Sequence, residues 1–257
     1  MPVVKKYLFL TFSITYVSWG MIAVYTQLKD IHFGSSIILY SLYIIGVIGP
    51  AIAGISASKV SESKDDYRRF LRSCYQPPKK VAWYIFMIVM VIILSLLPYF
   101  VSGGEQIASA LSILLQLPLF ILIGGLEEIG WRGFMLRELS TRMPAFTSTL
   151  LVSVVWILWH LPLFFIIGTY QNEYLNIPVF SVSVISFSFL LSTIYYKTNS
   201  IFLCIMAHAL CNSVLNVFVS NQSLAGEMIA LCFAIFIYWL FTSNRKKSIS
   251  KKVDAQS

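Results

Sequence analysis

The sequence has little charge. Of its 257 residues only 12% are Asp, Glu, Lys or Arg, and 58% are hydrophobic. A typical soluble domain has about 25% charged residues and about 45–50% apolar residues. A mean hydropathy of +0.77 agrees with this imbalance. The scarcity of charge excludes an ordinary soluble protein and predicts an integral membrane protein.

Several familiar site patterns are also missing. The four cysteines form no C-x-x-C pair and lie mostly in apolar runs, so neither a disulfide framework nor a cysteine metal site is expected. The lack of HExxH excludes a zincin, and the lack of GxSxG removes the usual sign of a serine hydrolase. No Asp falls in a predicted span, which disfavours an aspartyl intramembrane protease. A rhomboid-like Ser–His pair would leave two glutamates, described below, unexplained.

Long apolar runs dominate what is present. A transmembrane helix needs about 20 mostly apolar residues. Runs of that length predict eight spans, near residues 7–27, 37–57, 81–101, 107–126, 147–167, 177–196, 200–220 and 226–243. The fourth is expected to continue as an interfacial helix to about residue 140, with a bend at Pro118 or at Gly124 and Gly125. The predicted fold is an all-α polytopic transmembrane helix bundle, with one integral membrane domain at 1–243 and a basic cytoplasmic tail at 244–257.

The net charge of +8 is explained by membrane topology. If the N-terminus is cytoplasmic, 18 of the 19 basic residues, Arg132 among them, fall in cytoplasmic segments, and only Lys29 does not. Lys and Arg collect in the cytoplasmic loops of membrane proteins. The asymmetry therefore predicts an even number of spans, both termini in the cytoplasm and a multi-pass protein of the cell membrane. It also removes the need for a nucleic-acid partner.

Polar side chains interrupt three of the predicted spans. They are Glu127, Glu128 and Arg132 at the end of the fourth, His160 in the fifth, and His208 with Asn212 in the seventh. Ionisable residues at bilayer depth are costly, so each is a functional hypothesis by default. Glu128 and Arg132 share a helix face at i and i+4 and are expected to pair, which leaves Glu127 to face another partner. We expect the three helices to line one cavity in the cytoplasmic half of the membrane.

This set of residues suits water attack on a carbonyl, most directly peptide hydrolysis. Burial in a low-dielectric pocket raises the pKa of a carboxyl group toward that of a general base. The imidazoles can then act in two ways. In the first, Glu127, His160 and His208 bind a divalent metal such as zinc. In the second, the imidazoles and the Asn212 amide donate hydrogen bonds to an oxyanion without a metal. As a structural alternative, the pair Glu128–Arg132 staples a helix end and the other residues join helices.

The three polar segments resemble the motifs of one family in order and in spacing. EEIGWRG resembles the EExxxR motif of the CPBP family, the CAAX-protease and bacteriocin-processing (Abi-like) intramembrane proteases. WILWH resembles its FxxxH motif, with Trp156 in the aromatic position, and HALCN resembles HxxxN. The match covers roughly residues 110–220. The resemblance implies that Glu127 activates water, that Glu128 and Arg132 support it, and that His160, His208 and Asn212 complete the site.

The resemblance leaves the catalytic type and the substrate open. The family has been described both as metalloproteases and as glutamate proteases without an obligatory metal. It includes enzymes that cleave prenylated CAAX termini and bacterial members linked to bacteriocin maturation or self-immunity, and this compact chain resembles the bacterial kind. The expected partners are a peptide or membrane-protein substrate and the lipid bilayer. One alternative is a non-catalytic bacteriocin-immunity or scaffold protein, and another is a proton-coupled transporter, for which no inverted repeat is visible.

Overall fold

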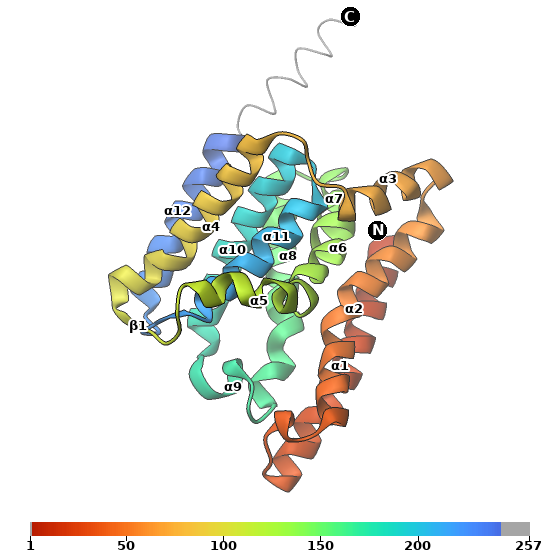
Figure 1. The fold of residues 1–257 in the computed structure, drawn as a ribbon. Coiled ribbons are helices and arrows are strands. Elements are labelled where there is room, and N and C mark those ends of the chain that lie inside the picture. The colour runs from red at the N-terminus through yellow and green to blue at the C-terminus, as the bar shows by residue number, and fades with distance from the viewer. Residues whose placement is uncertain (1, 243–257) are drawn as a thin grey trace, which may run out of the picture.

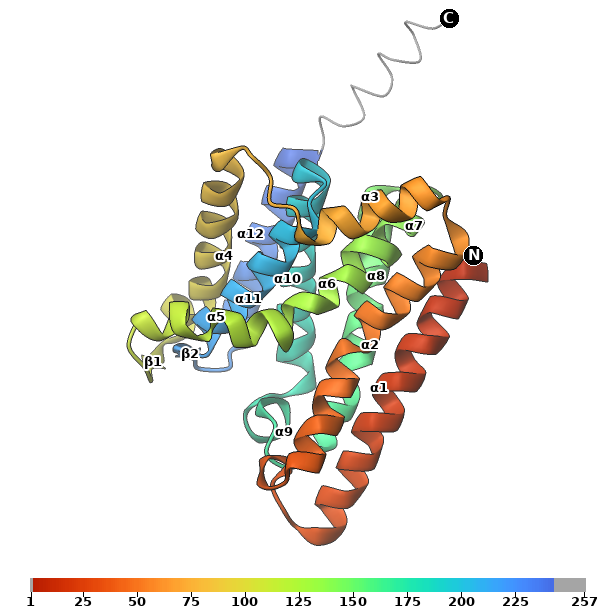
Figure 2. The ribbon, with the colours of Figure 1, turned by 45° about the vertical axis from the view of Figure 1, so that its right-hand side comes forward.

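The protein is a bundle of helices that run between two ends, as Figures 1 and 2 show. A computed structural model describes residues 2–242, and the predicted tail at 244–257 lies outside them. The long helices are α1 (Pro2–Lys29), α2 (Ile37–Ser61), α4 (Val81–Ser102), α8 (Ala145–His160), α10 (Ile177–Thr198), α11 (Ile201–Leu215) and α12 (Leu224–Thr242). The predicted all-α class is confirmed.

Shorter elements connect and interrupt the long helices. Between α2 and α4 lies α3 (Lys64–Tyr75), and between α8 and α10 lie η4 (Leu161–Phe165) and α9 (Tyr170–Tyr174); η1 (Phe33–Ser35) joins α1 to α2. The central run comprises α5 (Leu111–Leu122), η2 (Gly125–Glu127), α6 (Glu128–Gly130), the π-helical segment η3 (Trp131–Leu136) and α7 (Arg137–Ser140). Strands β1 (Gly104–Gln106) and β2 (Phe218–Ser220) pair antiparallel, with Gly104 opposite Ser220.

The helices form where apolar runs coincide with capping residues. In lipid the backbone must satisfy its own hydrogen bonds, and a helix does so within one segment. The Asn176 side chain accepts a hydrogen bond from the Val179 amide at the start of α10, and Ser200 does the same for Leu203 at the start of α11. Large apolar side chains such as Phe9 and Trp239 are exposed on the outside, as contact with lipid requires.

The number of spans differs from the prediction. Within residues 2–242, six helices are long and apolar enough to cross a membrane, or seven if the bent pair Leu111–Leu122 and Gly125–Ser140 is one span. The prediction of eight is therefore not confirmed. The apolar run at 200–220 forms a helix of 15 residues, because the chain leaves the helix after Leu215. The predicted bend near Gly124 is present, with 41° between the two halves, and α5 lies across the bundle in Figure 2.

Both ends of the described chain lie at the same end of the bundle, together with α3 and α7. We call this the basic end. The loop end, opposite to it, is made of residues 29–36, 103–110, 166–176 and 216–223. The even number of crossings and the side of the membrane on which these ends lie stay predictions. Arg132 was wrongly counted among the loop cations, because its side chain is fully buried.

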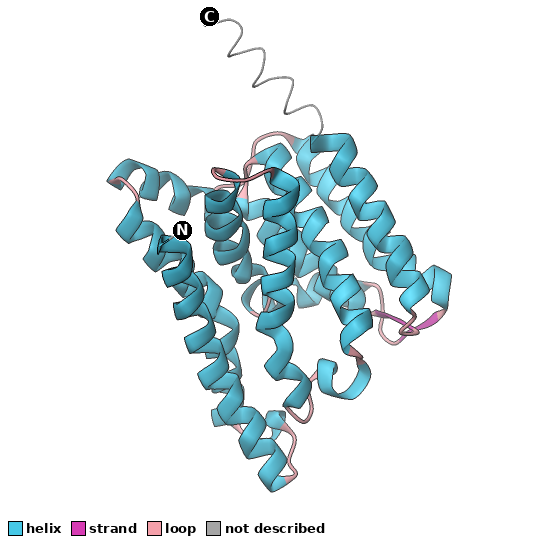
Figure 3. Ribbon diagram, turned by 180° about the vertical axis from the view of Figure 1, so that it is seen from behind, coloured by secondary structure: helices cyan, strands magenta, loops and turns pink. Residues whose placement is uncertain are grey.

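The functional residues sit where the α1–α2 hairpin meets the remaining helices. The hairpin slants away from them toward the loop end, as seen from behind in Figure 3. It touches the central run at α6, where a side chain at Gly130 would collide with the Pro50 carbonyl oxygen of α2. Helix α10 packs against α8, α11 and α12. The centre of the molecule is thus formed by the central run, α8, α10 and α11.

Candidate functional site

The chain changes helical form several times where it carries the two adjacent glutamates. Helix α5 ends before Gly124, a 3₁₀ turn covers Gly125–Glu127, and a π-helical segment runs from Trp131 to Leu136. π-helical turns are rare and often occur at functional sites. A Cβ at Gly124 would lie 2.5 Å from Asn212 Nδ2 and 3.2 Å from His208 Nε2. A side chain at Gly124 would therefore displace the Asn212 amide from its present position.

Glu128 and Arg132 form a buried ion pair, as their i, i+4 spacing predicted. Arg132 Nη1 lies 3.0 Å from Glu128 Oε2, and both side chains are fully buried. Arg132 Nη2 also donates to the Ser188 hydroxyl over 2.8 Å, and His208 Nδ1 lies 2.9 Å from Glu128 Oε1. We call these four residues the ion-pair network. A buried charge is tolerated when it has a partner and further hydrogen bonds, and this network supplies both.

Glu127 points to other partners. Its Oε2 atom accepts a hydrogen bond from Trp156 Nε1 over 2.9 Å and another from Trp131 Nε1 over 3.3 Å. Within the described chain, no ion pair involves Glu127. The carboxylate is 4% exposed and lines the cavity described below. Two neutral donors thus hold one oxygen and leave Oε1 without a hydrogen bond to the indoles.

The hydrogen bonds of the two histidines define their ring orientation. His160 Nδ1 lies 2.8 Å from the Trp156 carbonyl oxygen. Since a carbonyl only accepts, Nδ1 carries the proton, and Nε2 of the neutral ring is left as an acceptor. His208 Nδ1 is held by the Glu128 carboxylate, so its Nε2 is the ring nitrogen that lies near Gly124 and Asn212.

Trp156 contacts all three motif segments. Beyond its hydrogen bond to Glu127, its ring centroid lies 5.5 Å from that of His160 and 5.4 Å from that of His208. The guanidinium carbon of Arg132 lies 4.8 Å from the same ring. Phe, the usual residue of the second motif, has no N–H group to donate. The departure from the motif therefore adds a hydrogen bond to Glu127.

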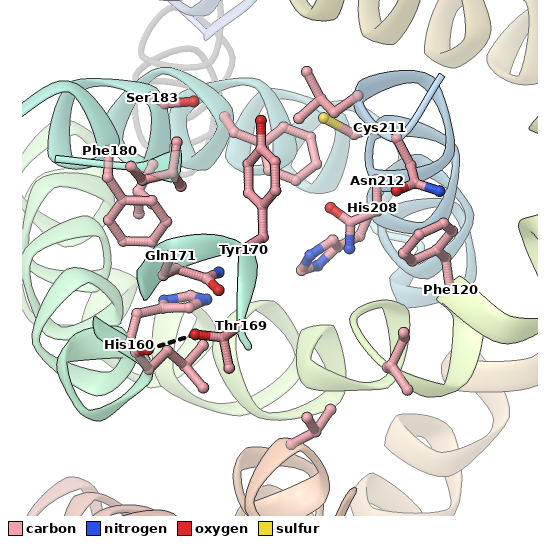
Figure 4. Close-up of a pocket in the computed structure, with 18 of the residues that line it drawn as sticks. Phe120, His160, Thr169, Tyr170, Gln171, Phe180, Ser183, His208, Cys211 and Asn212 are labelled. Atoms are coloured by element: carbon pink, nitrogen blue, oxygen red, sulfur yellow. Dashed lines mark hydrogen bonds between the residues drawn. The ribbon is translucent and has the colours of Figure 1, made fainter. Parts of the chain in front are cut away.

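One cavity joins four of the six predicted residues. Its volume is about 340 Å³, within the range of small-molecule sites. Glu127, His160, His208 and Asn212 line it, while Glu128 and Arg132 lie behind its wall. Figure 4 shows His160 on one side of the space and His208 with Asn212 on the other. The rest of the lining is mixed, and its aromatic members include Trp19, Tyr43, Phe120, Phe180 and Phe187.

The predicted metal ligands do not form a metal centre in this geometry. In residues 2–242, no three His, Cys, Asp or Glu side chains are close enough to hold one ion. Glu127 Oε2 accepts hydrogen bonds from two indoles, while the Nδ1 bonds of His160 and His208 leave the Nε2 atom of each ring free. A catalytic zinc site needs three converging protein ligands. Glu127, His160 and His208 do not converge as three ligands in this arrangement, so the metal stays a prediction and the proposed mechanism does not use one.

Sequence reasoning missed four residues of the site. Trp131 could have been found, because it lies four residues after Glu127 on the same helix face. Glu227 could also have been found, since it is an acid inside the predicted span at 226–243 and lines the cavity. Ser188 and Tyr170 gave no signal, because they reach the site from elements distant in sequence.

The fold and the site define a polytopic membrane protein with a polar centre buried among its helices. The family of type II CAAX prenyl endopeptidase Rce1-like proteins matches residues 109–214. CAAX prenyl protease 2 of Methanococcus maripaludis is 28% identical over 257 aligned positions, which cover 91% of this chain and 93% of that protein. With the three motifs in order, these matches support a protease of the CPBP type. They support an intramembrane endopeptidase and a multi-pass location in the cell membrane.

Proposed function

We propose that the protein is an intramembrane endopeptidase in which Glu127 activates water for attack on a peptide carbonyl. The observation that carries the proposal is the contrast between the two adjacent glutamates. Glu128 is committed to Arg132 and His208, whereas Glu127 faces the cavity without a cationic partner. A general base must be able to reach a water molecule beside the substrate, and Glu127 is the one of the two that meets this condition.

The contacts of the site support a sequence of proton transfers. Water bound between Glu127 Oε1 and His160 Nε2 attacks the carbonyl carbon, and its proton passes to Glu127. The carbonyl oxygen becomes negative and is stabilised by the Asn212 amide, which lies beside His208 Nε2 near Gly124. The C–N bond then breaks, and Glu127 returns the proton to the leaving amine. One water molecule is consumed for each bond broken: its hydroxyl becomes part of the new carboxyl group, its proton goes to the new amine, and Glu127 ends as a carboxylate.

The ion-pair network supports this chemistry indirectly. The ring nitrogen that His208 offers to substrate is decided by the hydrogen bond on its other nitrogen. Glu128 makes that bond over 2.9 Å, and Arg132 holds Glu128. Their expected role is to position His208 and not to touch the substrate. The location of the cavity in the cytoplasmic half of the membrane stays a prediction.

The substrate is proposed to be an apolar peptide or a membrane-protein segment. The aromatic lining of the cavity favours an apolar ligand. A prenylated CAAX peptide is the first candidate, because the matching family and the relative from Methanococcus maripaludis are described as acting on such termini. A bacteriocin leader peptide is the second, because the three motifs are shared with bacterial members linked to bacteriocin maturation.

The deciding experiment compares Glu127→Gln with the wild type in detergent or liposomes on both classes of peptide. We expect cleavage to fall by about 10²–10⁴-fold, the usual contribution of a general base, with an unchanged thermal unfolding midpoint. Glu105→Gln, an exposed acid on β1, is the matched control and should cleave normally. Unchanged cleavage by Glu127→Gln would overturn the mechanism. If no peptide is cleaved and the variant keeps the cellular phenotype, the immunity or scaffold alternative is favoured.

A further inference from the structure

The cavity contains carboxylates but no cationic side chain. Of its lining residues, Glu127 and Glu227 are acidic, and none is Lys or Arg. Arg132 is the cationic residue nearest to Glu127 in sequence, but it lies behind the cavity wall and is paired with Glu128. The proposed reaction uses Glu127 and leaves Glu227 without a role.

Glu227 is a buried carboxylate without a counter-ion. It lies in the first turn of α12, is 7% exposed and lines the cavity together with Ser183 of α10. Across residues 2–242, no Lys, Arg or His forms an ion pair with it. A single hydroxyl does not neutralise a carboxylate, and burying an unpaired charge is costly. An intramembrane acid of this kind indicates a ligand or a proton path.

Tyr170 shows which part of the cavity Glu227 faces. Burial raises the pKa of the Tyr170 hydroxyl, and Tyr174 and the Glu227 carboxylate raise it further. Tyr170 belongs to α9 at the loop end, so Glu227 lies near the part of the cavity that this loop borders. In Figure 4, Ser183 and the Tyr170 ring lie toward the α10 side of the space, apart from His160.

The loop end, like the cavity lining, carries more acids than Lys and Arg residues. Its segments carry the acids Asp30, Glu105 and Glu173, while Lys29 is their one Lys or Arg and His32 Nε2 lies 3.8 Å from Glu173 Oε1. A cleft lined by charges of one sign between low-dielectric walls concentrates ligands of the opposite sign. Glu227 therefore lies at the inner side of a region that attracts cations.

The position of Glu227 in the first turn of α12 could also reflect a favourable interaction with the helix dipole, which is distinct from ligand binding. An acid there interacts favourably with the helix dipole, by about 0.3–1 kcal/mol at exposed sites. That effect accounts for a contribution to stability. It does not account for a carboxylate that lines a cavity with no cation to accompany it.

We propose that Glu227, with the Ser183 hydroxyl, binds a positively charged nitrogen of the substrate while Glu127 acts on the peptide bond. The nitrogen belongs to a Lys or Arg side chain or to a free amino terminus. The cleavage part of this inference rests on the proposed endopeptidase function, whereas the binding part does not. The protein would then select apolar peptides that carry one cationic group.

Binding is measured first, with the full-length Glu127→Gln variant so that no peptide is cleaved. The probes are fluorescent Leu/Ala decapeptides in which one Lys is scanned along the chain, each with a norleucine counterpart. Every probe is made with an acetylated and with a free amino terminus, which separates the two sources of charge. We expect at least one cationic form to bind about 10-fold tighter than its neutral counterpart, as for hydrogen bonds to charged groups. Adding Glu227→Gln should remove that difference, and adding Asp65→Asn, which changes an exposed acid of α3 at the basic end, should keep it.

Cleavage of the same peptides is then compared between the wild type, Glu227→Gln and Ser183→Ala. The expected result is a loss of preference for cationic peptides in Glu227→Gln and a smaller loss in Ser183→Ala. Equal binding of cationic and neutral peptides, or a preference that survives Glu227→Gln, overturns the inference. A lower unfolding midpoint with an unchanged preference shows the dipole role alone and also overturns it.

If Glu227→Gln does not fold, Glu227→Asp and Ser183→Ala replace it. Failure of the wild type to cleave any probe counts against the proposed function, and the binding result still decides the subsite.

Discussion

Glu127 and Glu128 are neighbours in sequence, equally apolar in their flanks and both buried, yet they belong to two different regions. Glu128 lies in the ion-pair network, where Arg132 and His208 satisfy its charge. Glu127 lies on the wall of the cavity, where its contacts are neutral indole donors. The comparison teaches that burial alone does not identify a reactive carboxylate. The two glutamates differ in whether the carboxylate already forms an ion pair.

The comparison also explains why the motif needs both acids. Successive residues of a helix point about 100° apart, so two adjacent carboxylates cannot serve the same partner. One faces α10 and α11, and the other faces the cavity. The three predictions below test this division of roles, beginning with the largest expected effect.

The ion-pair network is expected to contribute strongly to stability. Arg132→Met should lower the free energy of unfolding by about 3–5 kcal/mol, because it leaves the charge of Glu128 buried and unpaired. Denaturant unfolding in detergent micelles measures the loss. The double variant Glu128→Gln with Arg132→Met should recover much of it, since neither charge then remains. An Arg132→Met variant as stable as the wild type would mean that Glu128 does not depend on its partner.

The indole donors are expected to affect catalysis more than stability. Trp156→Phe removes the 2.9 Å hydrogen bond to Glu127 while keeping an aromatic ring. A hydrogen bond to a charged group contributes about 1.5–3 kcal/mol, so kcat should fall by about 10-fold or more with little change in KM. Trp131→Phe, which removes the 3.3 Å bond, is the matched control and should cost less. Equal effects of the two variants would contradict the assignment of Trp156 as the main donor.

Removal of divalent metal is expected to have the smallest effect. Since no three ligands converge in the described part of the chain, cleavage should persist after exhaustive dialysis against a chelator. Bound zinc is measured in parallel in the wild type, His160→Ala and His208→Ala. A loss of activity that zinc restores, with less bound zinc in both histidine variants, would instead establish the metal mechanism.

The sequence predicted the parts of this protein that depend on local physics. Apolar runs of sufficient length form helices because a bilayer leaves the backbone no other short-range partner, and the i, i+4 pair of Glu128 and Arg132 follows from helix geometry. The bend at Gly124 was also predicted. The motif residues Glu127, His160, His208 and Asn212 were correctly expected to share one cavity.

Other features could not be read along the chain. The count of eight spans assumed that each apolar run crosses the membrane, but α11 has 15 residues and α5 lies across the bundle. Arg132 was counted with loop cations because hydropathy does not reveal which side of a helix meets another helix. Glu227 could be read as an acid inside the predicted span at 226–243, but only the structure shows that it lines the same cavity as Glu127.

By itself the sequence determined that this is a helical membrane protein whose three polar segments resemble the CPBP motifs, because composition, helix periodicity and motif spacing are local properties. Only the tertiary structure decided that Trp156 holds Glu127, that Ser188 completes the ion-pair network and that Glu227 faces the same cavity. Trp156 is 29 positions from Glu127, Ser188 is 56 positions from Arg132, and Glu227 is 100 positions from Glu127. Only the packing of the helices brings residues so far apart in sequence to one site.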